Sequence, residues 1–183
     1  MTQGQRPPAR PAGRGGLEHM WSPWRSEYIS STAGEGDGGC LFCDHLAAGD
    51  DEATGILHRG KSVFVLMNAY PYNTGHLMIA PNRHVGELED LTSKERTEMM
   101  DLSAESVRII RDAMKAHGFN LGINLGAVAG AGVPGHIHLH VVPRWGGDTN
   151  FMPVVANTKV LPEMLADTAR KLRPGFEALG RAH

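Results

Sequence analysis

The sequence predicts an α+β fold with a mainly antiparallel sheet, one long amphipathic helix and a C-terminal helix. The β-rich segments 62–68 and 76–80 are separated by a short loop of turn-forming residues, and such close spacing favours an antiparallel pair. Residues 93–117 carry apolar side chains at helical spacing and follow a Thr92–Glu95 capping box. Together these observations indicate strands that precede a long helix, with further strands after it.

Each predicted element follows from local sequence. The segment 62–68 is rich in β-branched and apolar residues, and Pro81 is expected to stop the strand that follows it. Gly118 is the expected end of the long helix, because glycine readily adopts the left-handed conformation found there. The remaining strands and the C-terminal helix are expected at 120–126, 136–142 and about 162–172.

The composition is typical of one soluble globular domain. The chain has 183 residues, of which 41% are hydrophobic and 21% charged, so it is long enough to bury a core. Its formal net charge of −2 gives no basic surplus for nucleic acid, and no apolar stretch is long enough to span a membrane. Without a recognisable signal peptide, the protein is expected in the cytoplasm.

The N-terminal residues differ in composition from the rest. Residues 1–19 are rich in Gly, Pro and Arg, and we expect a disordered tail there. From Met20 onward, large apolar side chains such as Trp21 and Trp24 predict a segment that docks on the body of the protein. Residues 20–183 are therefore expected to form a single domain with a C-terminal extension.

Three histidines alternate with apolar residues in the predicted strand 136–142. His136, His138 and His140 lie at positions i, i+2 and i+4, so a strand places all three on one face. Three interpretations are open: surface histidines, a zinc or copper site, or phosphoryl chemistry in which a neutral imidazole attacks phosphorus. The Gly-rich loop 126–132 favours phosphate chemistry, because small residues let backbone N–H groups approach an anion.

The run His136-Ile137-His138-Leu139-His140-Val141-Val142 resembles the signature His-x-His-x-His-x-x of the histidine-triad (HIT) superfamily, in which x is apolar. Other features follow in the family's order, namely the Cys40-x-x-Cys43 pair, Asn68 eight residues before Gly75-His76, and the capped helix. The likeness covers about residues 20–155 and is closest to bacterial dinucleoside tetraphosphate phosphorylases and hydrolases. It implies the HIT-like fold and a nucleotidyl-transfer enzyme, commonly a homodimer.

The resemblance also implies roles for single residues. His138 would be the nucleophile that attacks the α-phosphate of a dinucleoside polyphosphate, and His140 would contact the phosphate. Asn68 matches a ribose-binding position, although an Asn that starts a turn fits equally well, and Asn124 matches a position that contacts phosphate or leaving group. Trp145 would cover a base by stacking, or else simply pack. Further substrate contacts are expected from Gly130, Ala131, Gly132 and Val133.

The segment before the triad departs from the family pattern. Many histidine-triad hydrolases carry Gln-Ser or Gln-Thr there, whereas this chain has Gly132-Val133-Pro134-Gly135. Backbone N–H groups would have to replace the missing hydroxyl and amide contacts, and Pro134 has no N–H to offer. The acceptor therefore stays open: water would give hydrolysis, and inorganic phosphate would give phosphorolysis.

Cys40 and Cys43 have the spacing of zinc ligands. The resemblance supplies two further ligands, His84 and His136, and a Cys₂His₂ set is a closed, structural site. The alternative is a redox or unligated CxxC, but a redox motif is expected to open a helix in a βαβ pattern, which the sequence does not indicate.

Several alternatives remain at this stage. A nucleoside phosphoramidase, a general nucleotide hydrolase of the same fold, a low-turnover nucleotide-binding signalling module and a triad-histidine metalloenzyme all fit the histidine strand. His76 is expected to make a structural hydrogen bond. The other histidines are expected on the surface; they are His19, His45, His58, His117 and His183.

Overall fold

The computed structural model describes residues 39–149 and 160–181. The predicted tail 1–19 and the docking segment around Trp21 lie outside these residues. The helices are α2 (Leu41–Ala48), α3 (Ser93–Met114), the short 3-10 turn η1 (Ala127–Ala129) and α5 (Leu165–Arg181). The strands are β1 (Ile56–Arg59), β2 (Val63–Met67), β3 (Leu77–Pro81), β4 (Gly118–Ile123) and β5 (Leu139–Arg144).

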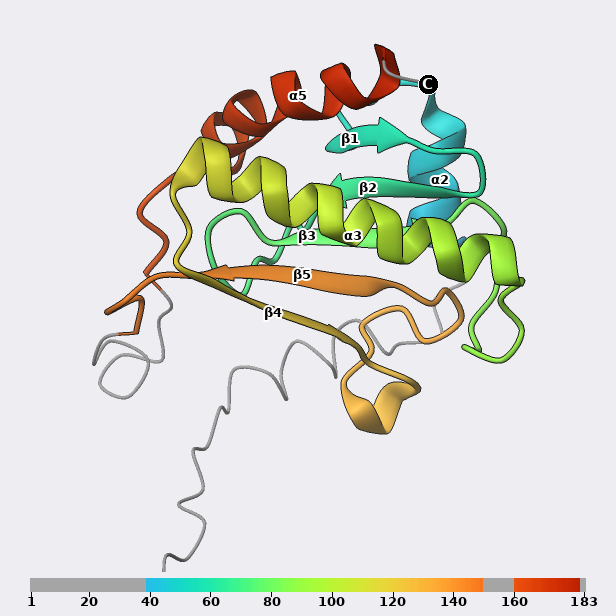
Figure 1. The fold of residues 1–183 in the computed structure, drawn as a ribbon. Coiled ribbons are helices and arrows are strands. Elements are labelled where there is room, and N and C mark those ends of the chain that lie inside the picture. Colours follow the sequence, from blue (N-terminus) through green and yellow to red (C-terminus); the bar gives the residue numbers. More distant parts are fainter. Residues whose placement is uncertain (1–38, 150–159, 182–183) are drawn as a thin grey trace, which may run out of the picture.

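The five strands form one sheet in the order β1-β2-β3-β5-β4, and every neighbouring pair is antiparallel. In Figure 1, α3 lies across one face of the sheet and α5 runs beside it over the β1 edge. The structure thus confirms the α+β fold with an antiparallel sheet, a long helix and a C-terminal helix. No helix among the described residues is long and apolar enough to cross a membrane.

The two faces of the sheet carry different cores. On the α3 face the side chains of alternate residues such as Val65, Ile79 and Val141 form a large apolar cluster with α3 and α5. The residues between them point to the opposite face, where Phe64, Leu66 and others meet Phe42 of α2 in a smaller cluster. The central strands are buried on both sides, so they read as continuous apolar runs.

The long helix begins as predicted and ends earlier. The Thr92 hydroxyl accepts from the Glu95 N–H, and the Glu95 carboxylate accepts from the Thr92 N–H, which completes the capping box. The helix ends at Met114, because Lys115 takes the left-handed conformation (φ 54°) and its N–H donates to the Arg111 carbonyl. Gly118 was therefore the wrong stop, and it begins β4 instead.

Three other expectations need correction. Regular pairing of β5 runs from Leu139 to Arg144, so Pro143 does not close the strand; it lies beyond Val141, the last β5 residue that pairs with β3. A proline is tolerated where one neighbouring strand no longer needs its N–H. β3 likewise includes Pro81, and α5 extends to Arg181 instead of about 172. The short elements α2 and β1 were not predicted.

Candidate active site and metal centre

The three triad histidines lie on the face of the sheet that α2 covers. All three are buried, with exposed fractions of 0% for His136, 4% for His138 and 8% for His140. Ile137 and Leu139 between them belong to the apolar core on the α3 face. The alternation predicted for residues 136–140 therefore holds, although regular strand pairing begins only at Leu139.

His138 is held in one tautomer by the backbone. Its Nδ1 lies 2.9 Å from the carbonyl oxygen of His136. Because a carbonyl can only accept, Nδ1 carries the proton, which leaves Nε2 with its lone pair when the ring is neutral. Burial lowers the pKa of His138, and this favours the neutral ring. Nε2 of His138 is thus the nitrogen suited to nucleophilic attack.

His140 is oriented by His76, a residue to which the sequence assigned only a structural bond. The Tyr72 N–H donates to His76 Nδ1 at 3.0 Å, so the proton of a neutral His76 lies on Nε2. That Nε2–H faces His140 Nδ1 at 3.0 Å, which places the proton of His140 on its own Nε2. Burial lowers the pKa of His76 to about 3, so the ring stays neutral near pH 7.

A cavity of about 540 Å³ opens beside His138 and His140. At the end near the triad it is bordered by Gly130, Gly132 and Val133. Strand residues Leu66, Met67 and Met78 line it further along, together with Leu41, Phe42 and His45 of α2. Residues 52–55 and Leu165, Ala166 and Ala169 of α5 complete its lining near the β1 edge of the sheet. His138 and His140 therefore border a largely apolar cavity.

Some N–H groups of the Gly-rich loop form hydrogen bonds within the loop itself and are not free to bind a ligand. The Gly130 N–H donates to the Ala127 carbonyl at 2.9 Å, and the Ala131 N–H donates to the Gly126 carbonyl at 3.3 Å. Ala131 is buried and does not line the cavity. Of the four expected contact residues, Gly132 and Val133 are thus the two that combine a place at the cavity with an N–H not used in closing the loop.

The two asparagines differ in their placement. Asn68 lines the cavity, and its side chain accepts from the Tyr70 N–H at 2.9 Å and lies 3.3 Å from His76 Nδ1. It therefore shapes a turn and also borders the cavity beside His138 and His140. Asn124 donates to the Gly130 carbonyl at 3.3 Å and so braces the Gly-rich loop instead of bordering the cavity.

Trp145 is not brought to the triad. Its ring packs on the core of the α3 face, and its Nε1–H donates to the Met114 carbonyl at 3.2 Å. It borders a separate cavity of about 550 Å³ beside Lys115 and Lys171. Residue 145 is an odd number of residues after His140, so its side chain leaves the strand on the opposite face. Ordinary packing, the second interpretation from the sequence, describes Trp145 in this chain.

Two other histidines also differ from the sequence expectation. His45 is only half-exposed and lines the triad cavity. His58 is half-buried, with its ring centroid 6.4 Å from that of Phe176. His117 is exposed as predicted, whereas His19 and His183 lie outside the described residues.

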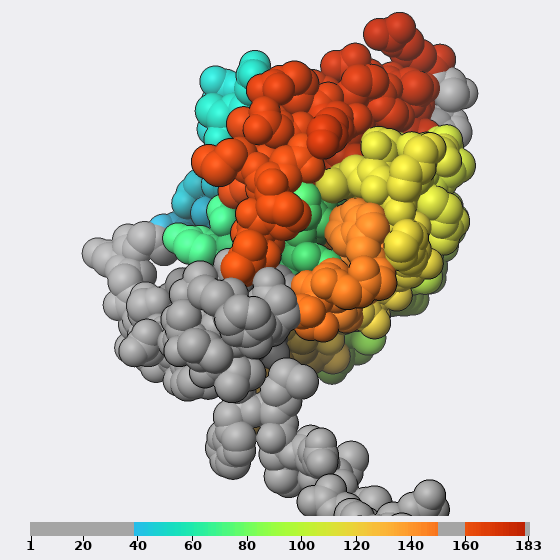
Figure 2. Space-filling model, turned by 90° about the vertical axis from the view of Figure 1, so that its left-hand side faces the viewer, coloured from blue at the N-terminus to red at the C-terminus, as the bar shows by residue number. Residues whose placement is uncertain are grey.

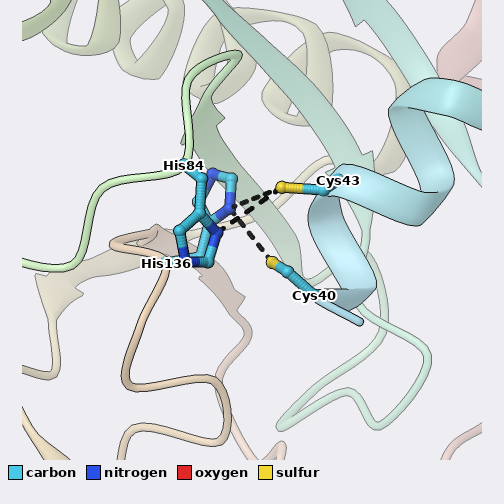
Figure 3. A group of neighbouring side chains, drawn as sticks. All are labelled: Cys40, Cys43, His84 and His136. Carbon is cyan, nitrogen blue, oxygen red and sulfur yellow. Dashed lines mark hydrogen bonds between the residues drawn. The ribbon is translucent and has the colours of Figure 1, made fainter. Parts of the chain in front are cut away.

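Four side chains converge around the first triad histidine, and Figure 3 shows them as Cys40, Cys43, His84 and His136. Their ligand atoms all lie within 4.8 Å of one another. His136 Nδ1 is 3.2 Å from Cys40 Sγ and 3.7 Å from Cys43 Sγ, and His84 Nδ1 is 3.5 Å from Cys43 Sγ. Tetrahedral zinc with ordinary bond lengths separates sulfur and nitrogen ligands by roughly 3.6 Å.

A hydrogen bond to the backbone fixes the tautomer of His136 that a metal ligand needs. Its Nε2 lies 2.8 Å from the Pro81 carbonyl and must donate to it, which leaves Nδ1 as the lone-pair nitrogen. Such a backbone partner is the usual orienting contact of a metal-bound histidine. The residues present therefore fit a closed Cys₂His₂ zinc site.

The CxxC pair does open a helix, contrary to the expectation from sequence. Cys40 is the N-cap of α2 and Cys43 lies in its first turn. The elements that follow are the antiparallel strands β1 and β2, not a βαβ unit, and both thiols are free. α2 also brings Phe42 within 5.0 Å, centroid to centroid, of both His136 and His138.

Comparison with known proteins places this site in a family. The model of the HIT domain matches residues 51–147. The chain belongs to the HIT domain family. It is 41% identical, over 85% of its length and 83% of the relative's, to the AP-4-A phosphorylase of Mycobacterium tuberculosis. It is also 33% identical, over about half of each chain, to the asymmetrical bis(5'-nucleosyl)-tetraphosphatase of Schizosaccharomyces pombe.

A solved structure supports the same fold assignment. The zinc-bound histidine triad family protein of Mycobacterium smegmatis superposes with a TM-score of 0.57 at 22% identity, over 86% of this chain and 96% of that one. This likeness concerns the fold. The family-model match and the 41% identical relative confirm the HIT family resemblance of residues 136–142.

Proposed function

We propose that this enzyme of the HIT family cleaves dinucleoside tetraphosphates such as diadenosine tetraphosphate by phosphorolysis, through a nucleotidyl adduct on His138. The observation that carries the proposal is the hydrogen bond from His138 Nδ1 to the His136 carbonyl, which leaves Nε2 as the nucleophile beside a cavity of about 540 Å³. The AP-4-A phosphorylase relative, which aligns with most of the chain, supports this substrate class.

The chemistry divides into two displacements. His138 Nε2 attacks the α-phosphorus, a nitrogen–phosphorus bond forms, and the bond to the bridging oxygen breaks so that ATP leaves. Inorganic phosphate then attacks the same phosphorus, the nitrogen–phosphorus bond breaks, and ADP forms. His140, whose proton is directed onto Nε2 by His76, serves as the donor to the phosphate oxygens in both steps.

The remaining substrate contacts follow from the cavity. Asn68 borders the space for the ribose, and the N–H groups of Gly132 and Val133 are the backbone donors for the phosphates. Asn124 acts by bracing the loop that carries those donors. The described residues that line the cavity include no Lys or Arg, so hydrogen bonds from backbone N–H groups and from His140 bear the main part of phosphate recognition there.

Zinc is the cofactor that fits the four-residue cluster, and its role in this proposal is structural. Cys40, Cys43, His84 and His136 would hold it, and a filled tetrahedral shell leaves no position for substrate. The bound metal would supply no step of the reaction. It would fix α2, and with it Phe42, against the strand that carries His138.

A homodimer is the proposed assembly, with the outer edge of β4 as its contact. β4 ends the sheet, so one side of its backbone has no neighbouring strand among the described residues. Leu121 of β4 is 44% exposed, and Leu125, two residues after the strand ends, is 42% exposed. An uncovered edge with apolar side chains is a template for pairing with a second chain. Analytical ultracentrifugation of Leu121→Lys against wild type would test the contact, and an unchanged dimer would exclude it.

The test of function is incubation with diadenosine tetraphosphate, with and without inorganic phosphate. Phosphate-dependent formation of ADP and ATP is the expected result. AMP and ATP without phosphate would replace the proposal by hydrolysis, the activity in the name of the fission-yeast relative. No cleavage, with turnover of an adenosine phosphoramidate, would replace it by a phosphoramidase. Binding without any turnover would replace it by a signalling module.

A further inference from the structure

A buried amide and a buried carboxylate join the end of β5 to the turn that precedes β3. Asn73 is 5% exposed, and the side chain of Asp148 is 8% exposed. Asn73 Nδ2 donates to Asp148 Oδ2 at 2.9 Å. Figure 2 views this end of the molecule, where the orange residues at the end of β5 lie against green residues of the strand region. Neither residue lines the triad cavity, so this contact has no direct part in binding the substrate.

The Asp148 carboxylate is held in one position from β5. Arg144 donates to Oδ2 through Nε at 2.6 Å and to Oδ1 through Nη2 at 2.9 Å. The Trp145 N–H donates to Oδ2 at 3.2 Å. Arg144 is held in turn by Asn120 Oδ1 of β4, at 2.9 Å. Because a bidentate pair of guanidinium and carboxylate has a fixed geometry, Asp148 presents Oδ2 to the amide of Asn73 in a defined place.

Asn73 uses both of its amide hydrogens on this end of the sheet. Besides Asp148, its Nδ2 donates to the Pro143 carbonyl at 3.0 Å, and since both partners are acceptors the orientation of the amide is fixed. β3 pairs with β5 only as far as Val141, so Asn73 makes its bond to β5 just beyond the end of that pairing. Gly75 also lies close to β5, because an added Cβ would be 3.2 Å from Pro143 Cγ.

The backbone of Asn73 connects this anchor to the triad. Its carbonyl accepts from the His76 N–H at 3.1 Å, which closes the turn of residues 72–76. From the same turn the Tyr72 N–H donates to His76 Nδ1, and His76 Nε2 faces His140 Nδ1, both at 3.0 Å. A displacement of the turn by about 1 Å would stretch the Tyr72 bond beyond hydrogen-bonding distance and release the tautomer of His76.

A second donor faces the same nitrogen of His76. Asn68 Nδ2 lies 3.3 Å from His76 Nδ1, and Asn68 Oδ1 accepts from the Tyr70 N–H at 2.9 Å. This contact does not pass through Asn73 or Asp148, and it is longer than the bond from the turn. Release of the turn should therefore reduce the population of the active tautomer without abolishing it, which limits the expected loss of rate.

We propose that Asn73 and Asp148 are positioning residues of the reaction: they hold the turn of residues 72–76 against the end of β5 and thereby keep the proton of His140 on Nε2. The role of that proton as a hydrogen-bond donor to the phosphate rests on the proposed function. The location of the proton does not rest on it, because it can be observed in the resting protein without any turnover.

The first test observes the proton. Wild type, Asn73→Ala and Asp148→Asn, labelled with nitrogen-15, are compared at neutral pH by two-bond proton–nitrogen NMR of the imidazoles, and the signals are assigned with His140→Gln. In wild type His140 Nδ1 should have the chemical shift of an unprotonated nitrogen. In both variants it should move toward the average of the two tautomers. Asn120→Ala is the matched control, because it removes a partner of the same arginine and leaves the turn intact.

The second test measures turnover of diadenosine tetraphosphate per folded molecule. Asn73→Ala and Asp148→Asn should lower kcat by about 10- to 100-fold, because misplacement of a catalytic donor by about 1 Å is costly. KM should change little, because neither residue lines the cavity. A merely structural role would lower the melting temperature and leave kcat and the His140 shift unchanged. Asp148→Asn keeps the shape of the side chain and gives the result if Asn73→Ala does not fold.

These measurements separate the positioning role from the proposed function. An unchanged His140 shift in both variants, or a protonated Nδ1 in wild type, would overturn the positioning role even in an enzyme that cleaves diadenosine tetraphosphate. A changed shift with unchanged kcat would also overturn it. If wild type does not cleave this substrate and the shift still changes in both variants, the proposed function fails, and the control of the His140 proton by Asn73 and Asp148 stands.

Discussion

The two faces of the sheet in this HIT protein carry different kinds of side chains. The α3 face is closed by a large cluster of aliphatic side chains from the sheet, α3 and α5. The α2 face carries the three triad histidines, a smaller apolar cluster and an eight-residue helix. Buried imidazoles and a short helix contribute little hydrophobic stabilisation. We therefore propose that packing holds the α3 face, whereas a metal held by Cys40, Cys43, His84 and His136 would hold the α2 face.

Metal removal should produce the largest loss of stability, and it should affect the α2 face more than the α3 face. Binding of structural zinc contributes roughly 10–16 kcal/mol in small peptides, comparable to the stability of a whole domain. A chelator should therefore lower the melting temperature strongly and expose the amides of α2 to hydrogen exchange before those of α3. Cys40→Ser should behave like the chelated wild type and should not respond to chelator. An equal loss of protection in α2 and α3 would contradict the proposal that the metal stabilises mainly the α2 face.

Loss of the proposed nucleophile, His138, should remove nearly all activity without lowering the stability of either face. His138→Asn should reduce cleavage of diadenosine tetraphosphate by about 10⁴-fold or more, as the removal of a covalent nucleophile does elsewhere. The exposed His117→Asn is the control and should keep wild-type rates. Circular dichroism melting should be close to wild type for both variants. Residual activity above about one tenth in His138→Asn would contradict the assignment.

Truncation of a core side chain on the α3 face should lower stability and leave activity unchanged, the opposite of the His138 variant. Ile79 is fully buried there, and Ile79→Ala should cost about 2–5 kcal/mol in the free energy of unfolding, measured in urea. The rate per folded molecule and the zinc content should stay the same, because the α2 face is not altered. A loss of zinc in Ile79→Ala would show that the two faces are not independent.

His76 gives the smallest effect and a pH signature for the α2 face. The unfolded chain protonates this histidine near pH 6.5, but burial lowers the pKa of the folded form to about 3. Its contribution to stability is therefore complete above about pH 6.5 and is lost as pH falls toward 3, by at most about 1.4 kcal/mol per pH unit. His76→Gln should flatten this decline between about pH 6 and 4. An unchanged slope would exclude the buried neutral His76.

The sequence predicted what depends on local periodicity and capping. The alternation of residues 136–140 and the Thr92 capping box carry their own signals, and both are found in the structure. The helix α2 could not be predicted, because eight residues are too few for a helical pattern, and its position depends on contacts of Cys40 and Cys43 with distant histidines. Trp145 could have been placed from sequence, since its odd spacing from His140 already puts it on the other face.

The positions of His76 and His45 could not be predicted from the sequence, for a different reason. The bond between His76 and His140 joins residues 64 positions apart, and nothing in the local pattern of either strand indicates it. His45 stands one helical turn from the CxxC start, where a short helix has no visible buried face. The antiparallel register of β3 with β5, in which Met78 lies opposite His140, brings His76 next to His140, whereas His45 reaches the cavity from α2.

The central claim is that His138 carries the nucleotidyl group, and it can be tested directly by trapping. Wild-type protein would be mixed with diadenosine tetraphosphate in the absence of inorganic phosphate, quenched in alkali to preserve a phosphoramidate, and digested for mass spectrometry. We expect AMP on the peptide that contains residues 136–140, with fragmentation locating it at His138, and its loss when phosphate is added before the quench. An adduct on His136 or His140, or no adduct in protein that turns over, would contradict the account.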